Sequence, residues 1–172
     1  MRKKAALLFL LCVLAATPAW ATKTYTDPVY LYSVDYPDTW REKNLGKVAN
    51  FLSPFESKED KFSENVTIEV RSLKDVPGAT NLLDYHRQAI SEAPDFLRDF
   101  KLLEEAKTKF AGKDAIAVLY TATVKGQLFR FKDYKFFVGK DIYILTFTAL
   151  NEDFDTFLAA AEKIMRSLRV SP

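Results

Sequence analysis

Four acidic side chains gather in one polar stretch of the sequence and are its best candidates for chemistry. They are Glu56, Glu59, Asp60 and Glu64. Carboxylate oxygens are ligands that Ca²⁺ prefers in proteins, but this spacing differs from that of an EF-hand loop. Lys58 and Lys61 lie among the acids and cancel part of their charge. The four residues are therefore weak calcium candidates, and their composition favours a solvated loop over residues 53–63.

Side chains for other kinds of catalysis are scarce. His86 is the single histidine, and Cys12 is the single cysteine and lies close to the N-terminus. The sequence contains neither a Gly-x-Ser-x-Gly segment nor a glycine-rich phosphate loop. Nucleophilic catalysis needs a nucleophile with a base beside it, and a transition-metal site needs several His or Cys ligands. We therefore predict no enzyme, no cofactor and no transition-metal site, and we expect His86 to pack beneath a helix.

The first 21 residues have the layout of a secretory signal peptide. Basic residues at positions 2–4 precede an apolar stretch over 5–17, and Ala19 and Ala21 offer the small side chains of a cleavage site. The apolar stretch is shorter than the roughly 20 residues that span a bilayer. We predict cleavage after Ala21 and a periplasmic or otherwise extracytoplasmic protein with no transmembrane segment afterwards. An uncleaved anchor and lipidation of Cys12 are the alternatives.

Cleavage would leave a nearly neutral chain. The whole sequence has 25 Lys and Arg and 23 Asp and Glu. Arg2, Lys3 and Lys4 leave with the segment, so 22 basic residues face 23 acidic ones and the formal charge is −1. This charge gives no electrostatic case for nucleic acid or for an anionic membrane surface. Loss of Cys12 also leaves no thiol for a disulfide.

The remaining pattern predicts one α+β domain over residues 22–172. Alternating apolar side chains between Gly or Pro turns predict strands at 29–36, 48–52, 65–73, 100–110, 115–124, 127–138 and 142–150. The short turns predict antiparallel pairing, hence a twisted antiparallel sheet of about six or seven strands flanked by helices. One helix is expected over 82–92, capped by Asn81 and stopped near Pro94. A second helix is expected after Asn151 as its cap.

Two elements carry patterns that predict packing. In the last helix Phe154, Phe157, Leu158, Ile164 and Met165 recur at helical spacing, with Phe157 in mid-stripe, and we expect all five to face the sheet. In the 127–138 strand one face carries Phe129, Phe131, Asp133, Lys135 and Phe137, and the other carries Arg130, Lys132, Tyr134 and Phe136. An exposed stripe of aromatic and charged side chains would suit an interface. Packing of these rings beneath helices is the interpretation that the fold class favours.

Four segments resemble the PsbP-like proteins in order and spacing. Tyr36-Pro37-Asp38-Thr39-Trp40 resembles their Tyr-Pro-x-x-Trp segment, and residues 64–68, 109–115 and 142–149 followed by Phe154 resemble their later strands and last helix. The resemblance implies a fold shared with Mog1 proteins, an α/β/α sandwich with an antiparallel sheet between helical layers. The photosynthetic members are extrinsic subunits of photosystem II that help to retain calcium and chloride. The family has no known catalytic residues to carry over.

This combination predicts an exported, non-enzymatic accessory or assembly module that binds another protein or a membrane-associated complex. The photosystem subunit has a long segment before its domain, whereas only Thr22–Thr26 precede the matching region here. A role like that subunit's is therefore an alternative. A periplasmic protein that binds calcium or a small ligand is another, which a concave pocket with converging polar groups would favour. An enzyme with an unrecognised carboxylate site is the third alternative.

Overall fold

A computed structural model describes residues 21–44, 48–58, 60 and 62–171. The predicted signal segment up to position 20 and the calcium candidate Glu59 lie outside the described residues. Neither α1 nor α2, nor any other described helix, is long and apolar enough to cross a membrane.

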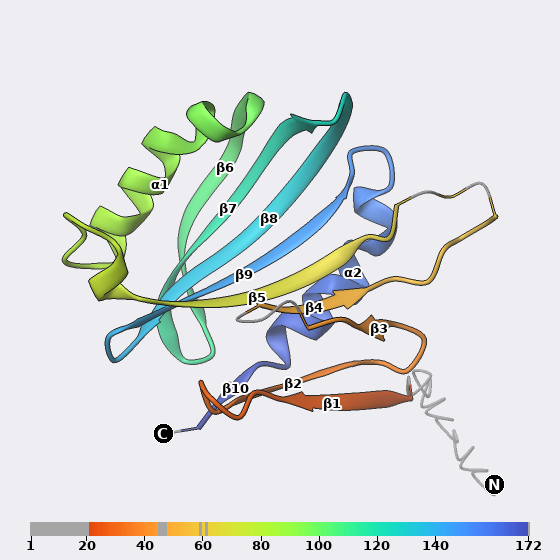
Figure 1. The fold of residues 1–172 in the computed structure, drawn as a ribbon, viewed down its shortest axis with the longest axis horizontal. Coiled ribbons are helices and arrows are strands. Elements are labelled where there is room, and N and C mark those ends of the chain that lie inside the picture. The colour runs from red at the N-terminus through yellow and green to blue at the C-terminus, as the bar shows by residue number, and fades with distance from the viewer. Residues whose placement is uncertain (1–20, 45–47, 59, 61, 172) are drawn as a thin grey trace, which may run out of the picture.

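Seven strands form one antiparallel sheet and three form another, and two α-helices pack against them (Figure 1). The large sheet has the order β3 (Arg41–Glu42), β4 (Val48–Leu52), β5 (Asn65–Ser72), β9 (Asp141–Leu150), β8 (Gln127–Val138), β7 (Lys113–Val124) and β6 (Arg98–Phe110). The small sheet has the order β1 (Thr22–Thr26), β2 (Tyr32–Pro37) and β10 (Arg169–Val170). The helices are α1 (Leu82–Phe96) and α2 (Phe154–Arg166), and a short 3₁₀ helix, η1 (Leu73–Asp75), precedes α1. The predicted α+β class and the antiparallel sheet of six or seven strands are confirmed.

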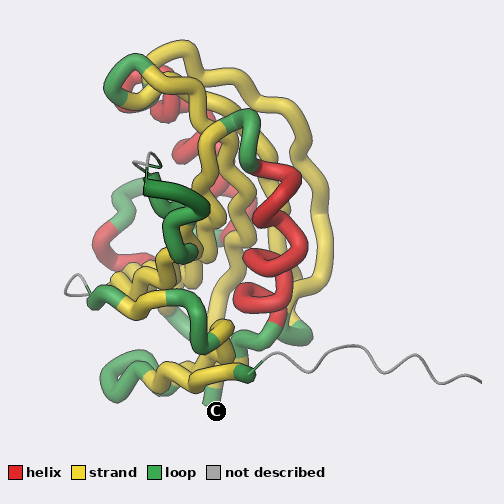
Figure 2. Tube along the Cα trace, turned by 90° about the vertical axis from the view of Figure 1, so that its right-hand side faces the viewer, coloured by secondary structure: helices red, strands yellow, loops and turns green. Residues whose placement is uncertain are grey.

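The helices lie on opposite faces of the large sheet. One core joins the large sheet, α2 and the small sheet through residues such as Val34, Phe136, Phe147 and Ile164. A smaller core on the other face joins Tyr85 of α1 to Ile142 and Ile144 of β9. Figures 1 and 2 show α1 alone on its side, with α2 and the small sheet across from it. The molecule is therefore layered as helix, sheet, and a mixed layer of helix and small sheet.

Consecutive strands β6 to β9 form a meander with very short turns. Ala111-Gly112 and Lys125-Gly126 each fill a two-residue loop, and all four residues have positive φ angles between 47° and 83°. Two positive φ angles define a type I′ turn, whose twist matches that of the strands on either side. Glycine at the second position avoids the strain that a Cβ would bring. The predicted 127–138 strand is reproduced as β8, and the predicted 48–52 strand as β4.

Several predicted boundaries were wrong for local reasons. The strand predicted at 29–36 is β2, and it starts at Tyr32, because the Asp27 carboxylate accepts the backbone N–H groups of Val29 and Tyr30 in a turn. Helix α1 runs through Pro94 to Phe96. Pro94 lacks one N–H donor, but the following turn is still closed by the bond from the Leu97 N–H to the Ala93 carbonyl.

The predicted cap of α2 was also wrong. Asp153 holds the N-cap position of α2 without a side-chain bond. Asn151 instead turns its Oδ1 toward Arg130, whose Nε donates to it over 3.1 Å.

The predicted sheet-facing stripe of α2 packs against the main core with all five residues, to different depths. Phe154, Ile164 and Met165 are buried, whereas Phe157 and Leu158 are only half-buried. The small sheet packs against the end of α2, where the Ser167 hydroxyl binds the backbone of Asp35. Phe154 is therefore the phenylalanine of α2 that is most deeply buried, and Phe157 lies at the edge of the same core.

Candidate binding face of the large sheet

The carboxylates of Asp60 and Glu64 form hydrogen bonds within the acidic loop. Asp60 accepts the backbone N–H groups of Glu56 and Phe62 over 3.1 and 3.0 Å. Glu64 is 2% exposed, and its Oε2 accepts the Ser53 hydroxyl over 3.0 Å. Burial raises the pKa of the Glu64 carboxyl. Within the described ranges no three His, Cys, Asp or Glu side chains converge as a metal site would require.

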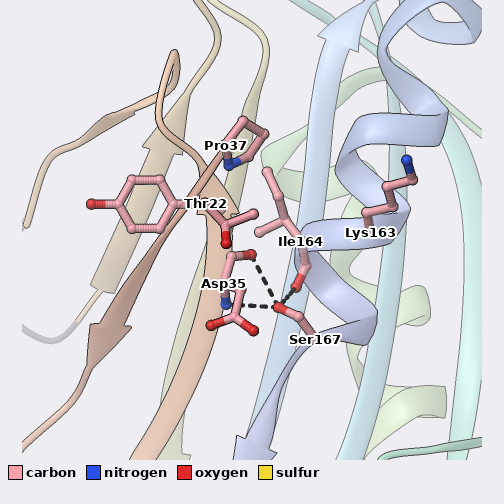
Figure 3. Close-up of a pocket in the computed structure, with 7 residues that line it drawn as sticks. Thr22, Asp35, Pro37, Lys163, Ile164 and Ser167 are labelled. Carbon is pink, nitrogen blue, oxygen red and sulfur yellow. Dashed lines mark hydrogen bonds between the residues drawn. The ribbon is translucent and has the colours of Figure 1, made fainter. Parts of the chain in front are cut away.

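A cavity of about 270 Å³ lies between β2 and the end of α2, where the small sheet is attached to the helix (Figure 3). The Ser167 hydroxyl accepts the Asp35 N–H over 2.8 Å and lies 2.7 Å from the Ile164 carbonyl oxygen that accepts its proton. The Asp35 carboxylate receives two N–H groups of Arg169 over 2.8 and 2.9 Å and the Thr24 hydroxyl over 2.7 Å. These bonds, those from Arg169 first, lower the pKa of Asp35. The polar groups here already hold the two layers together.

The opposite face of the sheet, beneath α1, contains buried charges. Asp133 and Lys135 of β8 are only 4% and 6% exposed, and their carboxylate and ammonium groups lie 3.4 Å apart. Asp133 Oδ1 has no hydrogen-bond partner in the structure. Burial raises the pKa of Asp133, and the neighbouring Lys135 opposes that rise. Buried charges are costly unless they are paired and hydrogen-bonded. Lys135 supplies the counter-charge, and a side-chain hydrogen bond from Thr146 also opposes the rise in the pKa of Asp133.

His86 belongs to the same layer. It is 1% exposed, which agrees with the prediction of a packing histidine, and its Nε2 lies 3.0 Å from Glu105 Oε2 on the edge strand β6. The ring is therefore enclosed between α1 and the sheet.

A pocket opens between the C-terminal half of α1 and the buried charges. Its volume is about 270 Å³. The sheet supplies Arg71, Phe100, Tyr120, Asp133 and Lys135, and α1 with the residue after it supplies Ala89, Glu92, Ala93, Phe96 and Leu97. The pocket thus has a charged and aromatic floor and a wall made of small and apolar helix residues. Polar and aromatic side chains thus line a shallow pocket whose volume lies just below the roughly 300–1,000 Å³ of typical ligand sites.

Five aromatic rings form a continuous row across the same face. The ring centroids of successive pairs are 4.9 Å apart for Phe62–Phe129, 6.2 Å for Phe129–Phe131, 4.8 Å for Phe131–Tyr120 and 5.5 Å for Tyr120–Phe100. Phe129 is buried, and the other four rings are half-buried. Figure 1 shows α1 along one side of the sheet, away from the β4–β5 loop that carries Phe62. The row therefore leads from the pocket toward the part of the face that α1 leaves uncovered.

Sequence reasoning found part of this face. It placed Phe129, Phe131, Asp133 and Lys135 together, as the structure does, and Phe136 on the opposite face. It missed Phe62, Phe100, Tyr120 and Arg71, which come from other strands or loops. The available signal was the presence of two charged side chains in a strand otherwise rich in aromatic residues. Charged side chains are almost never fully buried without a reason such as pairing or function.

Comparisons with known proteins bear on the fold. No family model matches the chain, and no curated protein does so. Among solved structures, a Pseudomonas aeruginosa protein of unknown function, PA94, is 18% identical with a TM-score of 0.65, covering 88% of this chain and 98% of its own. Cyanobacterial PsbP from Synechocystis sp. PCC 6803 is 14% identical with a TM-score of 0.63, covering 94% and 99%. LpqN of Mycobacterium tuberculosis, described as involved in cell envelope biogenesis, is 13% identical with a TM-score of 0.62, covering 88% and 92%.

These likenesses span nearly the whole of each chain at low identity, so they establish architecture rather than activity. The order of strands and helices, the antiparallel large sheet and the helix on each face agree with what the sequence motifs implied. The chain has a PsbP-like fold.

Proposed function

We propose that this protein is an exported, non-enzymatic accessory module that binds another protein, alone or in a membrane-associated complex, through the uncovered face of its large sheet. The observation that carries the proposal is the row of five aromatic rings from Phe62 to Phe100.

The row has the properties of a protein-binding surface. Aromatic side chains are enriched in the centres of interfaces, where they supply large apolar area for little lost rotational freedom. Here each ring is held by its neighbours, and Phe131 and Tyr120 stack with only 9° between their planes. Four of the rings remain half-buried, so a partner that covers them would remove further apolar surface from water.

A non-enzymatic role is supported by the set of side chains present. The single histidine is enclosed beneath α1, and cleavage after Ala21 would leave no cysteine. The partner-binding face is built from aromatic rings and one self-paired ion pair rather than from a nucleophile with a base beside it.

Export is supported by the signal-like segment and by the kind of protein that shares the fold, since LpqN is described as acting in cell envelope biogenesis. We expect the protein isolated from its native compartment to begin at Thr22, as measured by mass spectrometry of the intact chain. Thr22 opens β1, so this cleavage spares the strand, and among the described residues it removes the Ala21 carbonyl that accepts the Asp38 N–H. Retention of Met1, or a lipid on Cys12, would contradict the prediction.

The partner is expected to form a photo-crosslink to the aromatic row. The cross-linking residue p-benzoylphenylalanine would replace Phe131 in the native host, and a discrete adduct should appear after irradiation. Phe62→Ala in the same chain should weaken that adduct, because it removes the ring at the end of the row. Position 55 is the matched control, since Phe55 is an exposed phenylalanine outside the row. An equal adduct from position 55, or none from position 131, would argue against the proposed face.

The pocket beneath α1 favours a second function, the binding of a small ligand. Its lining combines the charged residues Arg71, Asp133 and Lys135 with the rings of Tyr120 and Phe100, and its volume of about 270 Å³ suits a compact molecule. The two surfaces share Tyr120 and Phe100, whereas Phe62, Phe129 and Phe131 belong to the row alone and do not line this pocket.

A further inference from the structure

We infer that the outer edge of the large sheet pairs with the same edge of a second copy of this chain. The strand at that edge is β6, which comes last in the sheet order, beyond β7 (Figure 1). No other described strand pairs with the outer side of β6. The contact uses the edge of the sheet rather than its face, so it goes beyond the protein partner proposed above.

The edge strand presents a long row of backbone groups to solvent. β6 has 13 residues, and residues 101–107 are all exposed. Such an edge is a template for pairing with another chain. The pairing of β6 with β7 shifts register twice before Glu104 and is regular from Glu104 to Phe110. Because bulges bend a strand and interrupt its ladder, the regular segment 104–110 is the part that accepts a new strand.

The geometry of a sheet limits how a second copy meets this segment. A two-fold axis perpendicular to the sheet makes the two β6 strands antiparallel and keeps both α1 helices on the same face of the joined sheet. Residues directly opposite one another across a strand pair point to the same face, whereas successive residues of one strand alternate between faces. One residue therefore lies at the axis opposite its own copy, and residues equally far on either side of it face one another.

Charge identifies the residue at the axis as Ala106. With Ala106 there, Glu105 faces Lys107 of the partner subunit, and Lys107 faces Glu105 of the partner subunit. Glu104 then faces a threonine, Thr108 of the partner subunit, which brings no repulsion. Opposite charges directly across a strand pair are stabilising, and like charges there are destabilising. This register thus contains two ion pairs and no like-charge pair over residues 104–108.

The neighbouring registers bring like charges together. An axis at Glu104 or Glu105 would place two glutamates opposite one another, and an axis at Lys107 would do the same with two lysines. An axis at Thr108 would place Lys107 opposite Lys109 twice. Lysines on an edge strand normally discourage pairing. The segment is therefore self-complementary in the register centred on Ala106 and self-repelling in those beside it.

The side chains around the axis are accessible. Ala106 and Lys107 are exposed, and the Glu105 side chain remains 44% exposed although its Oε2 lies 3.0 Å from His86 Nε2. A carboxylate accepts several donors, so Glu105 has capacity for a lysine in addition to the histidine. The small side chain of Ala106 leaves room for its own copy at the short distance that separates opposite residues in a sheet.

Pairing at this edge ends with two copies. A two-fold contact that uses the same strand of both subunits is closed. The other edge strand of the large sheet, β3, has two residues, and very short edge strands resist pairing. A contact along one short strand segment lies below the roughly 1,200–2,000 Å² of stable complexes. We therefore expect a weak dimer that depends on concentration.

Analytical ultracentrifugation of the protein purified from its native compartment tests the inference. The weight-average mass should rise from that of a monomer toward that of a dimer between about 5 and 500 μM, the range that suits a weak interface. A monomer throughout that range, or growth beyond a dimer, would overturn the inference.

Charge variants test the register. Lys107→Glu should weaken dimerisation roughly tenfold or more, because two cross-strand pairs change from attraction to repulsion. Glu105→Lys should do the same for the same reason. An equimolar mixture of the two variants restores both Glu–Lys pairs and should form a heterodimer about as strong as the wild-type dimer. A mixture that stays monomeric would overturn the register centred on Ala106.

Lys101→Glu is the matched control, because it makes the same charge change on β6 outside the pairing segment. It should leave dimerisation within about twofold of wild type. An axis at Glu105 would place Lys101 opposite Lys109, so tighter association of this variant would also overturn the register.

Ala106→Lys tests the edge without touching the Glu105–His86 contact. It places two lysines at the axis and should weaken dimerisation roughly tenfold or more. Its exposed position should leave the fold intact, as measured by circular dichroism. This variant decides the outcome if Glu105→Lys fails to fold, and undiminished dimerisation of folded Ala106→Lys would overturn the edge contact.

Discussion

Replacing Phe154 with alanine is expected to lower the free energy of unfolding by about 3–5 kcal/mol. The Phe154 side chain is 2% exposed at the start of α2, with its ring centroid 5.0 Å from that of Phe147 in β9. The Arg130 guanidinium lies over its other side at 5.0 Å. Truncation would leave a cavity between helix and sheet that these neighbours cannot fill. Since whole domains are stable by only about 5–15 kcal/mol, the loss should be plain in urea unfolding followed by circular dichroism.

Two controls on the same helix make the result specific. Phe157→Ala removes the same ring from a half-buried position and should cost clearly less than Phe154→Ala. Thr156→Ala changes an exposed position and should stay within about 0.5 kcal/mol of wild type. Equal losses for Phe154→Ala and Phe157→Ala would mean that α2 is rotated relative to the packing described above.

Removing the charge of either Asp133 or Lys135 alone is expected to lower the free energy of unfolding by about 3–5 kcal/mol. In Asp133→Ala the ammonium of Lys135, 6% exposed, loses the carboxylate beside it. In Lys135→Met the carboxylate of Asp133 keeps its burial and loses its counter-charge. Removing both charges together in Asp133→Leu/Lys135→Met should restore stability to near that of wild type, because apolar pairs of similar volume replace buried ion pairs at little cost. Urea unfolding of the four proteins measures the coupling as a double-mutant cycle.

The pH dependence gives an independent check. Burial raises the pKa of Asp133, so its folded-state pKa lies above its unfolded value. The stability that such a carboxyl contributes is fully present below the unfolded pKa and falls as pH rises through the folded pKa. Lys135 opposes the rise in the wild-type protein, so the penalty in Lys135→Met should be largest at neutral pH and shrink toward pH 4. A penalty independent of pH would show that Lys135 acts by packing rather than by charge.

If the doubly apolar variant is as stable as wild type, the buried pair is unnecessary for folding.

Local pattern was enough to predict most of the secondary structure. Residues 127–138 alternate between two faces because successive side chains of a strand point in opposite directions, and β8 follows that pattern. Gly112 and Gly126 mark the type I′ turns, because only a residue without a Cβ adopts their backbone angles at no cost. The strand boundary near Asp27 was wrong because the Asp27 side chain bonds to the following backbone, and the helix boundary was wrong because α1 continues through Pro94. Neither feature is visible in the spacing of apolar residues.

The small sheet illustrates what local pattern cannot predict. Strand β10 has only two residues, Arg169 and Val170. It forms because these residues pair with β2, which lies near the other end of the sequence. The Ser167 hydroxyl binds the Asp35 backbone across 132 positions. Such short strands carry no periodicity of their own, since their pairing depends on the edge that the rest of the fold presents.

By itself the sequence determined the α+β class, the meander, the two faces of β8 and a core-facing position for His86, because these follow from spacing along one strand or helix. Only the tertiary structure decided that Tyr120 lies opposite Phe131, that Phe62 joins their row, and that Asp133 and Lys135 end beneath a helix with a pocket above them. The register between strands sets which side chains from distant segments become neighbours, and the placement of α1 sets which of them remain open. Neither the register between strands nor the placement of α1 can be read from the spacing of residues within one segment. The candidate binding face is therefore visible only in the assembled sheet.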